Sequence, residues 1–295
     1  MSTLQKPLPT LPQMPWNIKK AIVNSLDCNS QSAVRLCSRE FRDHVSKAPI
    51  FHKRLFISVG INCIILEAYP FPVRIGSLYY SPELENKAIG VFSKVVDHRD
   101  VTIGELQVLN QFTFLTSLVE FLEKRKTLLK VKKLNLTADM IRFGPLIHRL
   151  ISCLQPGVLE SIHLKNQQLM PSSLINWEAI SNTMQWKQAK QVLITGCSMS
   201  LPYKEWSHLE CPLLRVDDLT VEAVKGIMQN FYRNPEWEQM NIEHNGRHSK
   251  DISAYFEQLG MNMDDSFMDL PNPLNEKDVF TILAVGNVVS VLRKP

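Results

Sequence analysis

Apolar positions near the start of the chain follow a helical period. Ile18, Ile22 and Leu26 are spaced four residues apart, so a helix opening at Pro15 brings them to one face. Pro15 suits the first helical turn because its missing N–H has no intrahelical partner there. Two more short apolar segments follow before residue 45, which predicts three small helices. So few residues cannot enclose a core, and we expect this segment to complete its packing on another surface.

The residues of this segment resemble an F-box, and within that family the nematode branch. The resemblance is carried by Met14-Pro15, Ile22, Leu26, Val34-Arg35 and Cys37-Ser38-Arg39-Glu40-Phe41-Arg42. It implies that residues 10–55 dock a Skp-type adaptor and, through it, a cullin of a cullin-RING ubiquitin ligase. The residues expected to pack in this module or to face the adaptor are Pro15, Trp16, Ile18, Ile22, Leu26, Val34, Cys37 and Phe41. The alternative is that they form only the first helices of a single globular protein.

The following stretch predicts strands and then helices. Residues 56–100 are expected to be connecting strands and loops, because short alternating runs are punctuated by glycine and proline up to about residue 82. Wider apolar spacing predicts a helix over 87–97 and a long helix over 105–126, with a break near 111–113 as the alternative to a continuous helix.

A repeated pattern then predicts the architecture. The pattern apolar-x-x-apolar-x-apolar occurs at Val131/Leu134/Leu136, Leu159/Ile162/Leu164, Ala189/Val192/Ile194, Cys211/Leu214/Val216 and Trp237/Met240/Ile242. Most repeats are followed by residues of helical period, so each unit reads as a strand and a helix. Such units cannot bury both faces alone and must stack. The predicted fold class is therefore α/β: a three-helix F-box-like module followed by an irregular leucine-rich-repeat-like solenoid of strand–helix units. A non-solenoid α/β domain is the alternative.

The repeated region also resembles, as a block, the FTH domain that follows the F-box in many nematode proteins. The resemblance is carried by Val131-Lys132-Lys133-Leu134-Asn135-Leu136, the run 154–162, Trp186-Lys187-Gln188-Ala189-Lys190 and Val216-Asp217-Asp218-Leu219-Thr220. It implies that residues 101–262 recruit a target protein for ubiquitylation. Residues 263–295 are expected to form an acidic loop and strands that cap the stack.

Exposed aromatic residues are the expected target contacts, because aromatic and arginine side chains dominate binding hot spots. Most aromatic residues of the second half are expected in the core. Those on predicted loops are the candidates for exposed anchors, namely Tyr203, Trp206, Tyr232 and Arg233.

Cysteine usage predicts an intracellular protein. Six cysteines occur without CxxC spacing and no signal peptide precedes them, which predicts a reduced compartment and a cytoplasmic or nuclear location. The longest uncharged apolar run, 55–66, is about half of what a membrane-spanning helix needs, so no membrane partner is expected.

Basic charge is concentrated at the front of the chain. Residues 1–55 hold nine Lys and Arg against three Asp and Glu, whereas residues 56–295 hold 24 against 26. The front segment therefore suits an acidic partner, and the Skp-type adaptors of the resembling family are acidic. A nucleic-acid binder is an alternative that predicts steep salt dependence; the lack of interleaved aromatic residues and of a nucleic-acid motif argues against it.

Motifs for catalysis are missing from the sequence. It contains no P-loop, GxSxG, HExxH or paired CxxC. His244 and His248 have a spacing that can hold zinc on a helix, but Asn245-Gly246 between them predicts a turn and a solvated loop. We therefore expect no enzyme, cofactor or metal. The expected function is a substrate-recruiting adaptor of an SCF-type ligase, and the alternative is a scaffold that binds a protein partner without a ligase.

Overall fold

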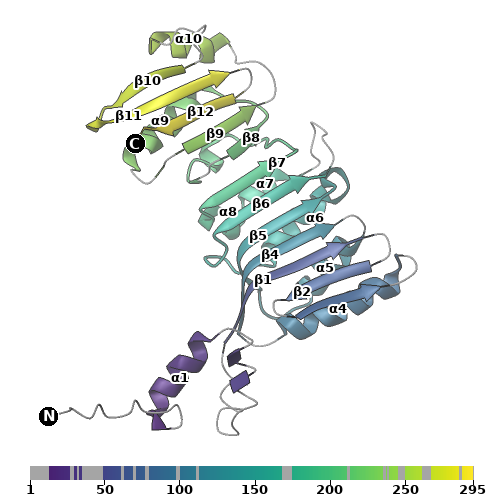
Figure 1. The fold of residues 1–295 in the computed structure, drawn as a ribbon. Coiled ribbons are helices and arrows are strands. Elements are labelled where there is room, and N and C mark those ends of the chain that lie inside the picture. Colours follow the sequence, from purple (N-terminus) through teal and green to yellow (C-terminus); the bar gives the residue numbers. More distant parts are fainter. Residues whose placement is uncertain are drawn as a thin grey trace, which may run out of the picture.

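A computed structural model arranges the chain around two β-sheets (Figure 1). It describes residues 13–26, 30–31, 33–34, 49–60, 63–68, 71–76, 80–97, 100–110, 113–167, 175–210, 213–234, 237, 239–244, 250–260, 267–285 and 288–294. Helix α1 (Trp16–Ser25) confirms the first expected helix. The other two expected helices of the N-terminal module fall largely outside the described residues.

The larger sheet has seven strands in the order β3-β2-β1-β4-β5-β6-β7. Strands β1, β4, β5, β6 and β7 run parallel in chain order, while β2 and β3 are antiparallel at one edge. The strands are β1 (Ile50–Val59), β2 (Cys63–Ala68), β3 (Phe71–Gly76), β4 (Val101–Asn110), β5 (Lys130–Ala138), β6 (Ser161–Asn166) and β7 (Gln191–Thr195).

Helices cover one face of this sheet (Figure 1). Parallel neighbours need a crossover between them, and helices fill these connections. They are α4 (Pro82–Val96), α5 (Phe114–Glu123), α6 (Met140–Ser152), α7 (Trp177–Ser181) and α8 (Met184–Gln188). Beneath them the strand register aligns one apolar side chain from each parallel strand, and every one is fully buried: Leu55, Leu106, Leu134, Ile162 and Val192.

The second sheet has five strands in the order β10-β11-β12-β9-β8. Strands β8 and β9 are parallel and the other neighbours are antiparallel. Its elements are β8 (Leu213–Val216), α9 (Val221–Arg233), β9 (Gln239–His244), α10 (Lys250–Gln258), β10 (Phe267–Asn272), β11 (Asn275–Val285) and β12 (Val288–Arg293). Of the C-terminal strands, β12 pairs with β9, and β11 and β10 follow outward from it. The acidic loop expected from residue 263 begins outside the described residues.

The two sheets meet where the chain leaves β7. The connection to β8 contains a short 3₁₀ turn, η2 (Tyr203–Glu205), where the earlier connections contain helices. A single bridge, between Met199 and Val216, adds to β8 on the side of β7. The indole N–H of Trp186 on α8 donates to the carbonyl of Glu205 at 2.8 Å, so side-chain contacts join the two parts.

The buried positions follow the repeated pattern and begin earlier than the sequence indicated. His52, Leu55 and Ile57 on β1 are buried with the same spacing as Val131, Leu134 and Leu136 on β5, and β4 repeats it. A regular strand buries every second residue, so a gap of three requires a local irregularity. The register of paired residues omits one residue on each strand within this gap: Lys53 on β1, Gly104 on β4 and Lys132 on β5.

A buried carboxylate joins α4 to α5. Glu85 is 7% exposed and accepts hydrogen bonds from the hydroxyls of Tyr80 at 2.5 Å, Thr113 at 2.5 Å and Ser117. These three donors offset the cost of removing the carboxylate from water. Burial, and then the hydrogen bond to Glu85, raises the pKa of Tyr80 well above its usual range, so its hydroxyl remains a donor.

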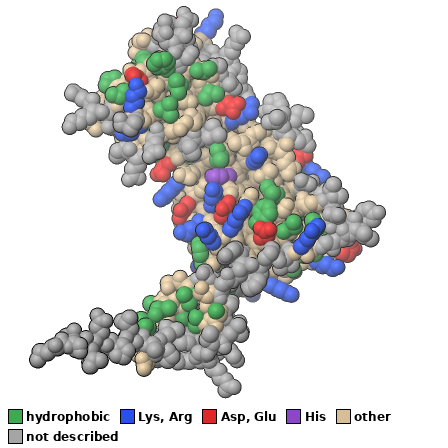
Figure 2. All heavy atoms as spheres, viewed as in Figure 1, with side chains coloured by type: hydrophobic (Ala, Val, Ile, Leu, Met, Phe, Trp, Pro, Cys, Tyr) green, Lys and Arg blue, Asp and Glu red, His purple; other side chains and the backbone are tan. Residues whose placement is uncertain are grey.

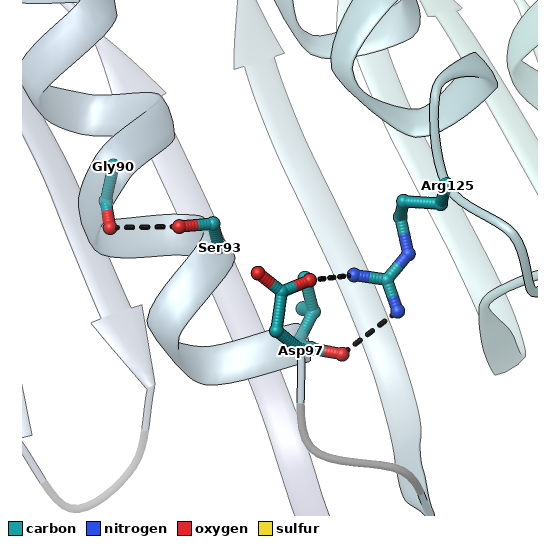
Figure 3. A network of polar contacts seen from close by, with 5 residues as sticks. Gly90, Ser93, Asp97 and Arg125 are labelled. Carbon is teal, nitrogen blue, oxygen red and sulfur yellow. Dashed lines mark hydrogen bonds and ion pairs between the residues drawn. The ribbon is translucent and has the colours of Figure 1, made fainter.

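A second polar contact holds the other end of α4 (Figure 3). The guanidinium of Arg125 donates to Asp97 Oδ1 at 2.5 Å and to the carbonyl of Val96 at 2.8 Å. The carbonyl of Val96 lies in the last turn of α4, where no intrahelical N–H is left to bind it. Arg125 therefore supplies the hydrogen-bond donor that the Val96 carbonyl lacks. Because Arg125 lies just after α5, this contact also joins the end of α4 to the end of α5.

One expectation from the sequence is wrong in this region. Residues 105–110 lie in strand β4, and the helix starts only at Phe114, just after the expected break near 111–113. Leu106, Val108 and Asn110 alternate and are buried on one side of the strand. The apolar residues of α5 follow directly, and together the two segments resembled one long helix.

The strands expected within residues 56–100 are present as the end of β1 and as β2 and β3, and the helix expected over 87–97 lies in α4. These strands belong to the main sheet.

Gly104 tests the importance of the skipped position. A Cβ at this residue would lie 2.6 Å from the backbone oxygen of Lys53, which cannot move aside freely. We expect Gly104→Ala to lower the free energy of unfolding by about 1–3 kcal/mol, a range typical of overpacking, measured by urea denaturation.

Gly90 provides the matched control. It lies within α4 and a Cβ there would meet nothing within 4 Å. Gly90→Ala should raise the free energy of unfolding by about 0.5–1 kcal/mol because glycine is a poor helix former. Equal effects of the two substitutions would contradict the close approach at Gly104.

Candidate functional site

The sheet face opposite the helices is the main candidate surface. Because side chains alternate along a strand, the neighbours of the buried residues point to this second face. We call it the open face, and it is formed by Arg54, Phe56 and Ser58 of β1, Glu105, Gln107 and Leu109 of β4, Lys133, Asn135 and Thr137 of β5, Ser161, His163 and Lys165 of β6, and Gln191, Leu193 and Thr195 of β7. Figure 2 shows charged side chains of both signs gathered over this sheet.

Hydrogen bonds across neighbouring strands fix part of the open face. The guanidinium of Arg54 on β1 donates to the Gln107 side chain on β4, and the Asn135 amide on β5 donates to Glu105. Arg54 also lies over the ring of Phe56, 5.4 Å from its centroid. The strand register places Glu105 beside Lys133 and Asn135 beside His163. These side chains therefore form one connected polar group over four strands.

His163 lies at the β6 end of this group. Burial lowers its pKa from the usual value of 6.5, the charge of Lys133 lowers it further, and Glu105 acts in the opposite direction. His163 is therefore neutral at pH 7, and the fixed charges around it are Lys133 and Glu105.

Two polar atoms of the open face lack a partner among the described residues. They are Asn135 Oδ1 and Ser161 Oγ. Asn135 uses its amide N–H for Glu105, which leaves its oxygen as a free acceptor. The side chain of Ser161 is 7% exposed, so its hydroxyl is removed from water without a protein hydrogen bond. Both atoms are buried, so leaving them without a hydrogen bond costs free energy in the folded protein.

Comparison with known protein families identifies this part of the chain. A family model described as the FTH domain matches residues 112–259, half of the sequence. The chain belongs to the FTH-domain family. The FTH match extends from just before α5 to just after α10 and lies within the expected range 101–262. No curated protein and no solved structure matches the chain.

The FTH match divides the open face. Strands β5, β6 and β7 lie inside it, whereas β1 to β4 precede it and belong to the same sheet. Glu105 precedes the match and accepts a hydrogen bond from Asn135 within it, and Arg54 pairs with Glu105 in the register. The candidate surface therefore extends beyond the FTH domain.

The residues expected to face a Skp-type adaptor lie on or near α1. Trp16 and Ile18 are each 45% exposed, Pro15 is exposed, and Ile22 and Leu26 are half-buried. Val34 is also half-buried, while Cys37 and Phe41 lie outside the described residues. The apolar stripe of α1 is thus only partly covered by its own chain.

The covered side of α1 differs from the expected one. Val23 and Lys19 are buried, although the helical pattern set Lys19 apart from the apolar stripe. The side-chain amide of Gln31 donates to the carbonyls of Val23 at 3.1 Å and Pro49 at 3.0 Å. Gln31 therefore links the C-terminal part of α1 to the residue just before β1.

The expected target contacts do not form one surface. Trp206 is 2% exposed, so it is not the exposed anchor that the sequence predicted. It is held inside because its indole N–H donates to Leu201 at 3.2 Å and the Tyr203 ring packs edge-on at 4.9 Å. Tyr203 is half-buried, and Gly226 leaves room for it on α9. Tyr232 is half-buried against Phe280, and Arg233 is exposed at the end of α9.

Tyr203 and Trp206 also line a cavity of about 250 Å³ with Asp217, Asp218 and Thr220. The carboxylate of Asp217 accepts a hydrogen bond from Ser198, so it helps to hold the start of the second sheet. We assign this cavity no ligand.

Other chemistry is limited in the part of the chain that the structure describes. No three His, Cys, Asp or Glu side chains there are grouped closely enough to hold a metal ion. His244 ends β9 and is buried, which corrects the expected solvated position, while His248 lies outside that part. Among the described helices, none has the length and apolar character needed to cross a bilayer.

Sequence reasoning missed the open face, although its signal was present. Lys132-Lys133 and Glu105 stand at the variable positions of the repeated pattern, between residues that are buried. Charged residues at such positions must point away from the core. Charged residues between the buried positions of a strand therefore indicate the open face more directly than aromatic residues in loops do.

Ser161→Ala tests the unpartnered hydroxyl. Removing a buried polar group that has no partner should raise the free energy of unfolding by up to about 1 kcal/mol. Ser181→Ala is the control, because Ser181 is equally buried but donates to the carbonyl of Glu178 at 3.1 Å. Ser181→Ala should lower the free energy of unfolding, and a similar loss for Ser161→Ala would show that its hydroxyl is satisfied. Urea denaturation measures both.

His163 should make stability depend on pH. Its folded pKa lies below the unfolded value of about 6.5, so the unfolded chain binds the proton first as pH falls. The wild type should therefore lose stability as pH falls from 6.5 towards the folded pKa, and His163→Gln should lose less. The measurement is the urea midpoint at several pH values between about 7.5 and 5. Parallel curves for the two proteins would contradict the shifted pKa.

Proposed function

We propose that this protein is a substrate-recruiting adaptor of a cullin-RING ubiquitin ligase of the SCF type. The N-terminal segment would dock a Skp-type adaptor, and the sheet domain that contains the FTH match would bind a target protein. The observation that carries the proposal is the exposure of Trp16 and Ile18 on α1, together with membership of the FTH-domain family. FTH domains follow an F-box in the nematode proteins that this sequence resembles.

The N-terminal half of the proposal rests on incomplete burial. Two large apolar side chains on a ten-residue helix remain exposed, and the neighbouring Ile22 and Leu26 are half-buried. Ile18 and Ile22 are one turn apart and share a face of α1, and an exposed apolar face of a helix favours a protein contact over water. The basic charge of residues 1–55 adds a long-range attraction to an acidic adaptor.

The second half of the proposal concerns the sheet domain as an irregular leucine-rich-repeat-like solenoid. It is supported by parallel strands that follow one another in chain order, by the recurring buried positions, and by helices confined to one face. Stacked units of this kind offer a long sheet surface to a partner. The target would bind there, while the helices supply the supporting layer.

Such a protein would act by proximity. Holding a target beside a ubiquitin-loaded enzyme raises the effective concentration of the two reactants, so the adaptor itself contributes no reacting group. On this proposal the protein works in the cytoplasm or the nucleus and needs no cofactor of its own.

Capture by a purified Skp-type adaptor tests the docking half. Ile18→Asp places a charge on an exposed apolar position and should reduce retention on the immobilised adaptor by about tenfold or more, as expected for a central contact. The same charge at Asn24, which is also exposed on α1, should change retention by less than about twofold. Both variants should unfold at the wild-type urea concentration.

Wild-type retention of the Ile18→Asp variant would overturn the docking claim. Failure of the wild type to bind any adaptor, with a target still bound, would instead favour the scaffold alternative.

A further inference from the structure

We propose that the open face binds an extended acidic segment of the target protein. The inference rests on the proposed function in one respect only, that the chain binds a target. It adds the chemistry of that target and the surface that recognises it.

Charge is the first argument. The open face continues onto β2 and β3, whose outward positions include Glu67 and Arg74, paired through the register with Phe56 and Ile65 respectively. Its cations are Arg54, Arg74, Lys133 and Lys165, and its anions are Glu67 and Glu105. Residues 56–295 as a whole hold more acidic than basic residues. The excess of positive charge is therefore particular to the open face and is not shared by the rest of residues 56–295. Complementary charge favours an acidic partner for this face.

The placement of the cations suits an extended chain. Arg54 on β1 and Lys133 on β5 share one row of the register with Glu105 between them, and Lys165 lies four residues further along β6. Adjacent strands lie about 4.8 Å apart and each residue rises about 3.3 Å, so Arg54 and Lys165 are separated by about 14 Å across the strands and about 13 Å along them, roughly 20 Å in all. An extended segment of about six or seven residues that runs obliquely over the strands can therefore reach from Arg54 to Lys165.

The aromatic content of these strands disfavours single-stranded nucleic acid. Binding of single strands relies on aromatic rings that stack on successive bases. Phe56 is half-buried and covered by Arg54, and Phe51 at the start of β1 is a single exposed ring.

A fluorescent decaglutamate peptide tests the proposal with the full-length protein. Fluorescence anisotropy should show saturable binding that weakens as sodium chloride is raised. The triple variant Arg54→Glu, Lys133→Glu, Lys165→Glu should bind at least about tenfold more weakly, because like charges then face the peptide. The neutral set Arg54→Gln, Lys133→Gln, Lys165→Gln should show an intermediate loss and keeps the test valid if the reversed set fails to fold.

Lys87, Lys94 and Lys187 provide a control of equal charge change. All three are exposed on α4 and α8, the helices that cover the opposite face. Their change to glutamate should alter the affinity by less than about twofold beyond the effect of net charge. Equal losses in the two reversed triple variants would overturn the open face as the binding surface, and so would the absence of wild-type binding to decaglutamate.

Polyuridine RNA of similar charge serves as the competing probe. Tighter binding of the RNA than of the peptide, lost in the same variants, would overturn the acidic-peptide proposal in favour of nucleic acid. Capture by the Skp-type adaptor is measured in parallel on each variant. If adaptor capture persists while the peptide fails to bind, this inference falls and the docking half of the proposed function stands.

Discussion

The apolar layer between the seven-stranded sheet and its helices is the constraint from which the other features follow. One fully buried side chain from each parallel strand, Leu55, Leu106, Leu134, Ile162 and Val192, stands in register across it. Burial of each side chain contributes about 1.5–3 kcal/mol to the free energy of unfolding. This contribution requires the neighbouring strand and helix, which shield the side chain from water. Because α4 to α8 lie on this side of the seven-stranded sheet, the intervening side chains of its strands point to the opposite face. The charged open face is thus the necessary complement of the core.

Polar contacts at the border of this apolar layer fix the positions of the helices. Glu85 near the start of α4 accepts hydrogen bonds from Tyr80, Thr113 and Ser117, and Arg125 donates to the last turn of α4. These contacts join α4 to α5 at both ends. Gln31 provides a similar tie between α1 and the start of β1. The exposed side of α1 is therefore presented by an anchored helix, and docking there would not have to order the helix first.

Much of the fold could be predicted from the sequence because the period of buried residues is a local signal. Val131, Leu134 and Leu136 predicted β5 and its successors, and the helices after them appeared where the period changed. Strand β4 was mistaken for helix because Gly104 and Glu105 interrupt its alternation, and because the apolar residues of α5 follow at once. The site was harder to predict. Whether Trp206 faces solvent depends on Leu201 and Tyr203, and whether Lys133 lies near His163 depends on a register between strands, neither of which a single segment encodes.

The limits of the FTH match have a consequence for anyone isolating that domain. The match starts at residue 112, after β4, and ends at 259, before the three strands that pair with β9 and with one another. A fragment trimmed to those limits would lack β4, which pairs with β5, and β12, which pairs with β9. Bare strand borders of this kind recruit further chains and drive aggregation. The family boundary records shared ancestry, whereas the smallest fragment able to stay soluble is set by where the hydrogen-bonded sheets end.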